Sequence, residues 1–289
     1  MKMKQALPVS KQVQAQILPL YLRYILNGFF LLGALIAFSL SAYAQDSAEK
    51  IYDYKVYAGG INAVDAQLRL EQTDKNFETE LKAITRGFIG KIAPWEGVYF
   101  TKGFFNQADQ ARPQTHIAQS TWRGDTEIKT FHYDNKGRFE SLTIVEKGKD
   151  KTPDDIDAKL AKNSVDLLSA MLNVMNTSVQ SNECSGSFNV FDGKRRFKLW
   201  FKPLGRETLS KSKYSAYAGP ALKCEVEIFP DGGRWHEKPR GWLSIQEQGR
   251  DKGALPLIWL AKVGESEHVI PVKMQVKTDY GVLFMHLVN

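Results

Sequence analysis

Apolar and polar residues alternate with a period of two along most of the chain from residue 51 onwards. In residues 61–70, for example, Ala66, Leu68 and Leu70 alternate with polar neighbours. The same alternation, rich in aromatic and β-branched residues, recurs in the runs 77–84, 127–133, 139–146, 196–201, 222–229 and 269–276. Turn-forming sequences lie between the runs, at 59–60, 134–137, 192–193, 230–233 and 278–281. This pattern is typical of antiparallel strands with one buried face, so it predicts a mainly β fold with minor α content.

One segment departs from this period and has helical spacing. The apolar residues that recur there at intervals of three and four are Val165, Leu168, Met171, Leu172 and Met175. Two helix starts fit the segment, either Thr152 followed by Pro153 or, further along, Ser164. An apolar face of this kind is expected to pack on the core. The whole pattern therefore predicts a curved antiparallel sheet, as a half-open or closed β-barrel, around one central helix.

Residues 1–44 have a different character. Their only charges are four basic residues, an apolar run covers 25–40, and small residues stand at positions 41, 42 and 44. This is the pattern of a cleaved signal peptide, with the cut expected between Ala44 and Gln45. The alternative is an uncleaved anchor, because residues 24–44 are about long enough to span a bilayer as a helix. We therefore expect one exported β-rich domain over 45–289, in contact with a membrane only if the leader is retained.

Removing the leader changes the charge balance. The chain has 39 Lys and Arg against 32 Asp and Glu, a net charge of +7, and four of the basic residues lie in the leader. The mature chain then has 39 − 4 = 35 basic against 32 acidic residues, a net charge of +3. A charge of this size leaves no electrostatic footprint for nucleic acid, so no nucleic-acid partner is expected.

The chain has two cysteines, Cys184 and Cys224, on separate strand-like runs. In an exported protein such a pair favours one disulfide. Two free thiols or a thiol nucleophile are the alternative, but neither cysteine has a neighbouring histidine. The bridge would close a loop of about 40 residues, which stabilises the fold by about 4 kcal/mol in the chain-entropy model.

No set of catalytic or metal-binding residues stands out in the sequence. The five histidines are scattered, and neither a G-x-S-x-G motif nor a phosphate-binding glycine loop occurs. The run 210–213 formally matches S-x-x-K, but it lies in a polar segment without the partner motif of penicillin-binding enzymes. The sequence therefore predicts a non-enzymatic protein without a metal or a cofactor.

Two stretches are candidates for ligand binding. The residues of the first that could line an apolar cavity or its mouth are Trp95, Tyr99, Phe100, Phe104 and Phe105, with ordinary core packing as the alternative. In the second, Lys194 and Arg195 follow a predicted turn at 192–193 and could contact an anion or a lipid headgroup. The alternative for this pair is a hairpin turn with solvated basic residues.

An ordered set of short motifs resembles an uncharacterised family of exported Gram-negative envelope proteins, the domain of unknown function numbered 3108. The motifs are Tyr54-x-Val56-Tyr57-x-Gly59-Gly60, Gly103…Arg112-Pro113, NSVDLLSAML at 163–172, Cys184…Val190-Phe191-Asp192-Gly193-Lys194-Arg195, Tyr217-x-Gly219…Cys224 and Ile270-Pro271-Val272…Thr278…Gly281. The resemblance covers essentially the whole mature chain and carries no established activity. It implies a remoter similarity in fold to the lipoprotein carriers LolA and LolB, in which a half-open barrel holds acyl chains. This chain differs from them in having fewer evident helices and a disulfide.

Three hypotheses of function follow. The first is a periplasmic protein of a Gram-negative bacterium that binds a lipid, a lipoprotein acyl chain or an envelope protein partner. The second is a structural module of the envelope whose aromatic residues are all core, and the third is a hydrolase of envelope polymers. The first is favoured by the aromatic-rich segment together with the lack of catalytic residues.

Overall fold

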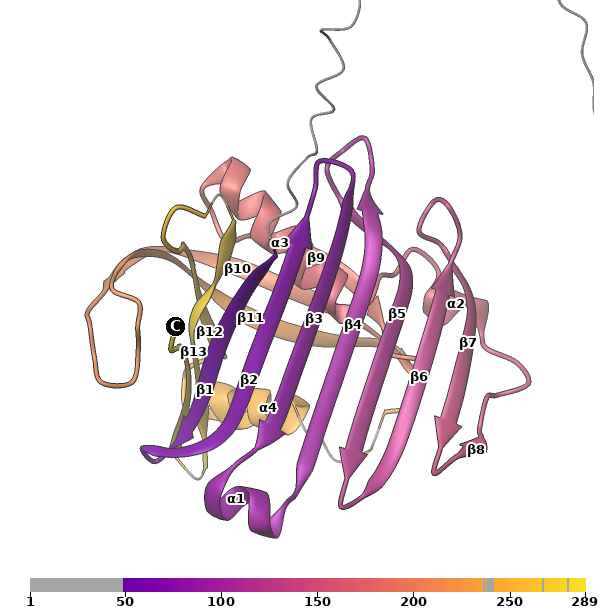
Figure 1. Ribbon diagram of the computed structural model, residues 1–289, viewed down its shortest axis with the longest axis horizontal. Coiled ribbons are helices and arrows are strands. Elements are labelled where there is room, and N and C mark those ends of the chain that lie inside the picture. The colour runs from indigo at the N-terminus through magenta and orange to yellow at the C-terminus, as the bar shows by residue number, and fades with distance from the viewer. Residues whose placement is uncertain (1–48, 236, 238–241, 267, 280) are drawn as a thin grey trace, which may run out of the picture. The chain divides into compact units, whose positions relative to one another are not determined.

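Fourteen antiparallel strands form one continuous sheet in this computed structural model (Figure 1). The structure describes residues 49–289 except 236, 238–241, 267 and 280, so the expected cleavage site at Ala44 and Gln45 lies outside the described residues. The strands are β1 Lys50–Ala58, β2 Ile61–Gln72, β3 Asn76–Thr85, β4 Trp95–Phe105, β5 Ala111–Trp122, β6 Asp125–Tyr133, β7 Phe139–Glu146, β8 Lys149–Asp150, β9 Gly186–Phe191, β10 Arg195–Leu209, β11 Gly219–Gly233, β12 Leu257–Lys262, β13 Val269–Thr278 and β14 Gly281–Leu287. The mainly β prediction is confirmed.

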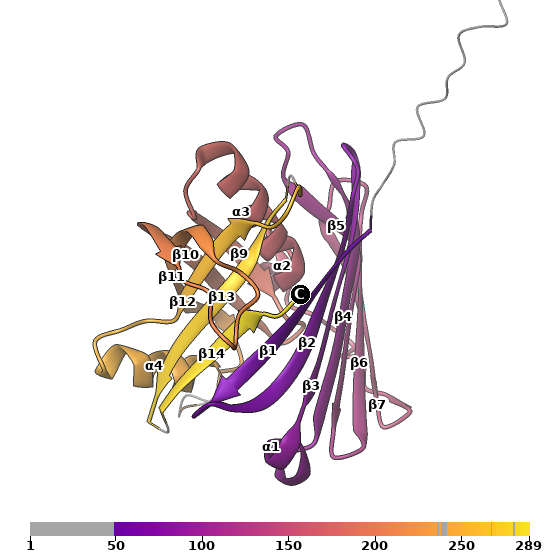
Figure 2. The same cartoon turned by 60° about the vertical axis from the view of Figure 1, so that its left-hand side comes forward.

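The order of the strands explains why the sheet stays open. Strands β1 to β8 and strands β9 to β14 each form a meander, and the two meanders join where β1 pairs with β14, for example at Tyr54 and Leu287. Figure 2 shows this junction, with the first and last strands side by side. The two free edges are therefore β8 and β9, which are consecutive along the chain. Of the two predicted forms, the half-open sheet is observed and the closed barrel is not.

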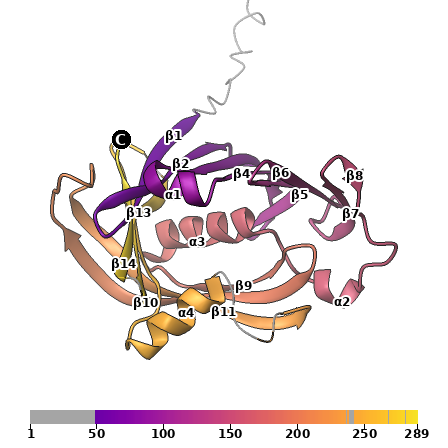
Figure 3. The ribbon, with the colours of Figure 1, turned by 90° about the horizontal axis from the view of Figure 1, so that it is seen from below.

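The segment that connects the two edges carries the main helix. It contains α2 (Ala158–Ala161) and α3 (Leu167–Ser181), and α3 contacts β4 and β5 of the first meander as well as β9 and β13 of the second. Figure 3 shows α3 lying between the two halves of the sheet. Because the connection must pass from one sheet edge to the other, the apolar stripe of α3 is buried against both halves. This is the central helix that the sequence predicts.

The helix begins later than either predicted start. Asp166 caps α3, because its carboxylate accepts hydrogen bonds from the backbone N–H groups of Leu168 and Ser169. Thr152 caps no helix: its hydroxyl accepts a hydrogen bond from the backbone N–H of Ile144 on β7, at 2.9 Å. The predicted start at Thr152 is therefore wrong, and the alternative at Ser164 lies within three residues of the first helical residue.

Two further helices lie outside this connection. The short α1 (Gly87–Ile92) joins β3 to β4, and α4 (Trp242–Asp251) lies between β11 and β12. The Gln246 side chain of α4 makes two hydrogen bonds with the backbone of Ile228, at 2.7 and 3.0 Å, which holds α4 to β11. Among the described helices, none has the length and apolar character needed to cross a membrane.

The predicted disulfide between Cys184 and Cys224 is present, with 5.8 Å between the two Cα atoms. Both cysteines are buried, and they join the exit of α3 to the middle of β11. They pack in a buried cluster with Phe201, Leu222 and Ile258. The bridge therefore fixes the C-terminal end of α3 against the second meander.

Candidate functional site: an apolar cavity beside the central helix

A cavity of about 350 Å³ lies between α3 and both halves of the sheet. Helix α3 contributes Leu167, Leu168, Met171, Leu172 and Met175. The first meander contributes Tyr54, Ala66, Leu68, Leu70, Thr79 and Leu81. The second contributes Phe197, Leu199, Val226, Ile228, Ile258, Pro271, Met274 and Met285. The volume falls at the low end of the ~300–1,000 Å³ that is usual for small-molecule sites.

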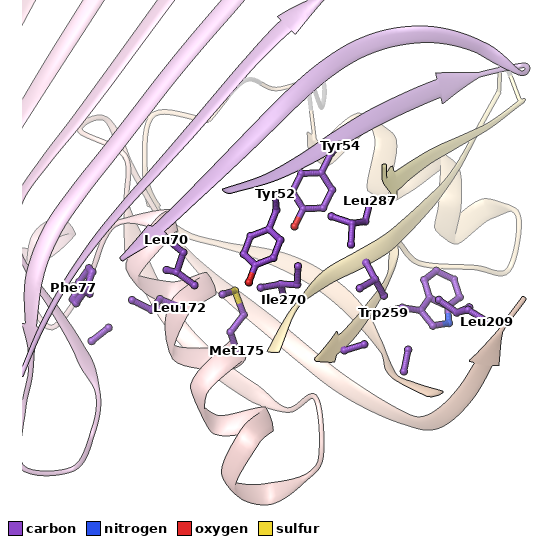
Figure 4. Close-up of a cluster of buried hydrophobic side chains, with 14 residues drawn as sticks. Tyr52, Tyr54, Leu70, Phe77, Leu172, Met175, Leu209, Trp259, Ile270 and Leu287 are labelled. Carbon is purple, nitrogen blue, oxygen red and sulfur yellow. The ribbon is translucent and has the colours of Figure 1, made fainter. Parts of the chain in front are cut away.

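The residues that line this cavity are apolar except for Tyr54 and Thr79, each of which carries a hydroxyl group. No described lining residue carries a charge. Figure 4 shows Tyr54 and its neighbour Tyr52 projecting from β1 to the side of the sheet where Leu172 and Met175 of α3 lie. Such a wall can hold hydrocarbon, but it offers nothing to neutralise an ionised group.

Methionine is concentrated in this wall. The chain has six methionines, two of them within the first three residues. The other four all line the cavity: Met171 and Met175 come from α3, Met274 from β13 and Met285 from β14. Because the unbranched thioether adapts to irregular spaces, a methionine-rich wall can follow the shape of a flexible ligand.

Leu167 indicates where the cavity opens. It is the first residue of α3, it lines the cavity, and it is nevertheless 46% exposed. Leu168, one residue later, lines the same cavity and is buried. The cavity is therefore open to solvent near the N-terminal end of α3.

A buried polar network holds that end of the helix. Asp166 Oδ1 accepts a hydrogen bond from the Thr101 hydroxyl of β4 at 2.8 Å, and Oδ2 accepts one from the Ser169 hydroxyl. His116 Nδ1 of β5 lies 2.8 Å from Thr101 Oγ1. Since threonine has one hydroxyl proton and donates it to Asp166, the imidazole Nδ1 must donate to threonine. The network thus ties the start of α3 to β4 and β5.

The same residue types occur in serine hydrolases, but their arrangement here is structural. The side chains of Thr101, His116, Asp166 and Ser169 are all buried, so a substrate has no path to Ser169. Ser169 bonds to the Asp166 carboxylate that caps the helix, and His116 bonds to Thr101 rather than to Ser169. Burial lowers the pKa of His116, and the nearby Asp166 carboxylate opposes that shift. No pattern in the sequence indicates this cluster, because its members lie far apart along the chain.

A second polar contact holds the middle of α3. The Asn173 side chain accepts a hydrogen bond from the backbone N–H of Ala111 at 2.8 Å and donates one to its carbonyl at 3.1 Å. Ala111 is the first residue of β5 and is fully buried. The helix wall of the cavity is therefore anchored at its start by Asp166, in its middle by Asn173 and beyond its end by the disulfide.

The aromatic segment predicted to line a cavity lies elsewhere. It forms β4, and none of Trp95, Tyr99, Phe100, Phe104 and Phe105 belongs to the cavity wall. The side chains of a strand alternate between its two faces, so Phe100 and Phe104 point away from the face on which Thr101 reaches Asp166. Phe105 packs on Phe77 with 5.4 Å between ring centroids, and the Trp95 indole donates a hydrogen bond to Ser120. The alternation of β4 therefore divides the aromatic residues between two environments.

The two basic residues of the β9–β10 turn already have carboxylate partners. Lys194 Nζ lies 3.3 Å from a Glu127 oxygen, and Arg195 forms a two-nitrogen contact with Asp192. The Asp192 carboxylate also accepts hydrogen bonds from the backbone N–H groups of both residues, which closes the turn. This geometry agrees with the hairpin-turn alternative for Lys194 and Arg195.

Some of the true lining residues had a signal in the sequence. The stripe of α3 and the alternation of Ala66, Leu68 and Leu70 were both predicted to face the interior. Neither pattern could show that space remains between them, because the rest of the wall comes from strands β10 to β14, more than a hundred residues beyond β2 along the chain.

Comparison with known proteins places the chain in a family. A family model described as "Protein of unknown function (DUF3108)" matches residues 53–288. The search of curated proteins found no relative. Among solved structures, the chain is similar to a beta-barrel-like protein of the domain of unknown function DUF1849 from Brucella abortus, at 12% identity and a TM-score of 0.45. That match covers 83% of this chain and 95% of the other. Because the family model spans nearly the whole domain, the chain belongs to the DUF3108 family.

Proposed function

We propose that this protein is a non-enzymatic periplasmic binding protein of a Gram-negative bacterium, and that it holds one acyl chain of a lipid or lipoprotein in the cavity beside α3. The observation that carries the proposal is the cavity itself, about 350 Å³ of space walled by hydrocarbon and thioether groups. An uncharged wall favours burial of an alkyl chain over a polar or ionic substrate.

The size of the cavity sets the size of the ligand. A methylene group occupies about the volume of a water molecule, ~30 Å³. About ten to twelve methylenes therefore fit in the cavity, which suits a single medium-length acyl chain. Burying ten methylenes releases about 8 kcal/mol before the cost of immobilising the ligand is subtracted. The net affinity should accordingly be micromolar or weaker.

The remaining features support the location and the mode of action. The N-terminal pattern is that of an exported protein, and a disulfide persists in an oxidising compartment such as the periplasm. The half-open sheet gives the ligand a route past Leu167, at the exposed end of the wall. The buried state of the Asp166 network supports binding rather than hydrolysis.

Native mass spectrometry of the mature protein, exported in its own host and purified without detergent, tests this proposal. We expect a chain that starts at Gln45, lacks two hydrogens because of the disulfide, and carries a lipid mass in part of the population. The same protein should bind dodecane or methyl dodecanoate in competition with an apolar naphthylamine dye. A bare chain that also takes up neither compound would overturn the proposal, and recovery of a defined envelope protein with that bare chain would favour a structural module.

A further inference from the structure

The hydroxyl of Tyr54 is a polar group placed at an apolar wall. Tyr54 lines the cavity and is 4% exposed, and its Oη atom has no hydrogen-bond partner among the described residues. A buried donor without a partner costs the fold the desolvation free energy of that group. Such a group calls for an explanation, and the place of Tyr54 in the cavity wall suggests that a ligand supplies the partner.

The Tyr54 hydroxyl is covered by neighbouring atoms when no ligand is bound. We infer that it turns towards the cavity on binding and donates a hydrogen bond to a neutral carbonyl oxygen of the bound acyl chain. This inference rests on the proposed function and deepens it, because it names the chemical class of the ligand as an acyl ester or acyl amide.

The surroundings of Tyr54 decide the direction of the bond. Burial raises the pKa of Tyr54, and the neighbouring Tyr52 adds to that shift, so the phenol keeps its proton and can donate. Tyr52 itself bonds to Ser266, at 3.4 Å, and does not line the cavity. A water molecule in the cavity would typically make about three hydrogen bonds, and the wall offers only Tyr54 and Thr79 as polar side chains. A ligand carbonyl needs only the one donor.

The charge of the wall decides the class of the carbonyl. A free carboxylate would be buried against a wall that has no cation among its described residues, and this burial would be costly. An ester or amide carbonyl accepts the hydrogen bond without bringing a charge. An alkane would bind to the same wall but would leave Tyr54 without a partner.

Tyr54→Phe provides the test, since it removes the hydroxyl and keeps the ring. Tyr133→Phe is the matched control, because the Tyr133 hydroxyl is likewise buried without a partner but does not belong to the cavity wall. The affinities of methyl dodecanoate, N-methyldodecanamide, dodecanoate at pH 8 and dodecane are measured by displacement of the naphthylamine dye. Thermal unfolding of each variant without ligand shows that the fold is intact.

We expect Tyr54→Phe to lower the affinity for the ester, the amide or both about tenfold, as for the loss of one buried hydrogen bond. Dodecane should bind both proteins equally, Tyr133→Phe should match the wild type, and dodecanoate should bind the wild type more weakly than the ester. If the wild type binds the ester more tightly than the amide, the natural ligand carries an O-acyl chain; if it binds the amide more tightly, the natural ligand carries an N-acyl chain.

Equal binding of the ester and the amide by Tyr54→Phe and the wild type would overturn this inference and leave the proposed function standing. An equal loss of affinity for dodecane would also overturn it, because the substitution would then act through the shape of the cavity. Binding of dodecanoate as tight as that of the ester would overturn the neutral class of ligand. If the wild type binds none of the four compounds, the proposed function fails and this inference fails with it.

Discussion

Enlarging Ala66 tests whether the space beside α3 is real. Ala66 lies on β2 and lines the cavity, and its cross-strand neighbour on β3 is the equally small Ala83. In the substitution Ala66→Leu, three carbon atoms are added to a wall that has room for them. In a close-packed interior the same change would force neighbouring side chains apart and cost about 1–3 kcal/mol. The sign of the stability change therefore separates a cavity from a filled core.

The volume of the cavity sets the size of the expected changes in stability and in ligand affinity. Three added groups occupy about 90 Å³ at ~30 Å³ each, roughly a quarter of the space. At ~0.8 kcal/mol per buried methylene, the free energy of unfolding should rise by up to about 2.4 kcal/mol. A ligand that fills the cavity loses room for about three methylenes, so its affinity should fall by about 2.4 kcal/mol, roughly 50-fold.

Urea unfolding followed by tryptophan fluorescence measures the first quantity, and dye displacement by methyl dodecanoate measures the second. Ala111→Leu is the control, because Ala111 also lies on a strand, is fully buried, and is held by Asn173 in packed surroundings. We expect that control to lose 1–3 kcal/mol of stability. A comparable loss at position 66, with unchanged ligand affinity, would refute the cavity.

Three further predictions concern the groups that hold α3. Reduction of the Cys184–Cys224 bridge, which spans 40 residues, should lower the free energy of unfolding by about 4 kcal/mol; urea midpoints that coincide with and without reductant would contradict this. Asp166→Ala removes the cap of α3 and leaves the Thr101 and Ser169 hydroxyls without their hydrogen-bond acceptor. It should lower the free energy of unfolding in urea by about 4 kcal/mol. A loss below about 1 kcal/mol would show that the network does not hold the helix. Burial lowers the pKa of His116 in the folded protein. The fold is therefore fully stable with respect to this group above the pKa of histidine in the unfolded chain, ~6.5. As the pH drops from there towards the folded pKa, the free energy of unfolding should fall by at most about 1.4 kcal/mol per pH unit. Unfolding free energies measured from pH 5 to 8 should show this slope in the wild type and a smaller one in His116→Gln; identical slopes would disprove the assignment.

Much of the local structure was determined by the sequence alone. A period of two and the turn residues are read from neighbours along the chain, so the strands and most hairpins could be predicted. The stripe from Leu168 to Met175 placed a helix in the right segment for the same reason. The disulfide followed from counting two cysteines in a chain whose N-terminal pattern predicts export.

The tertiary structure decided what neighbours along the chain cannot encode. The junction of β1 with β14 joins residues more than two hundred positions apart, and it is this pairing that places both free edges at the ends of the α3 connection. The start of α3 depended on Asp166 meeting Thr101 of β4, whereas Thr152 was already bonded to β7.

The site itself was the hardest part to predict. Aromatic density suggested Phe100 and Phe104, but the period of β4 turned them away from the face that meets α3. The cavity instead arises where Tyr54 of β1, Ala66 of the adjacent β2 and Met274 of the distant β13 meet α3 without filling the space between them. Unfilled space depends on how side chains from many elements pack together, so it exists only once the fold has brought those elements into contact.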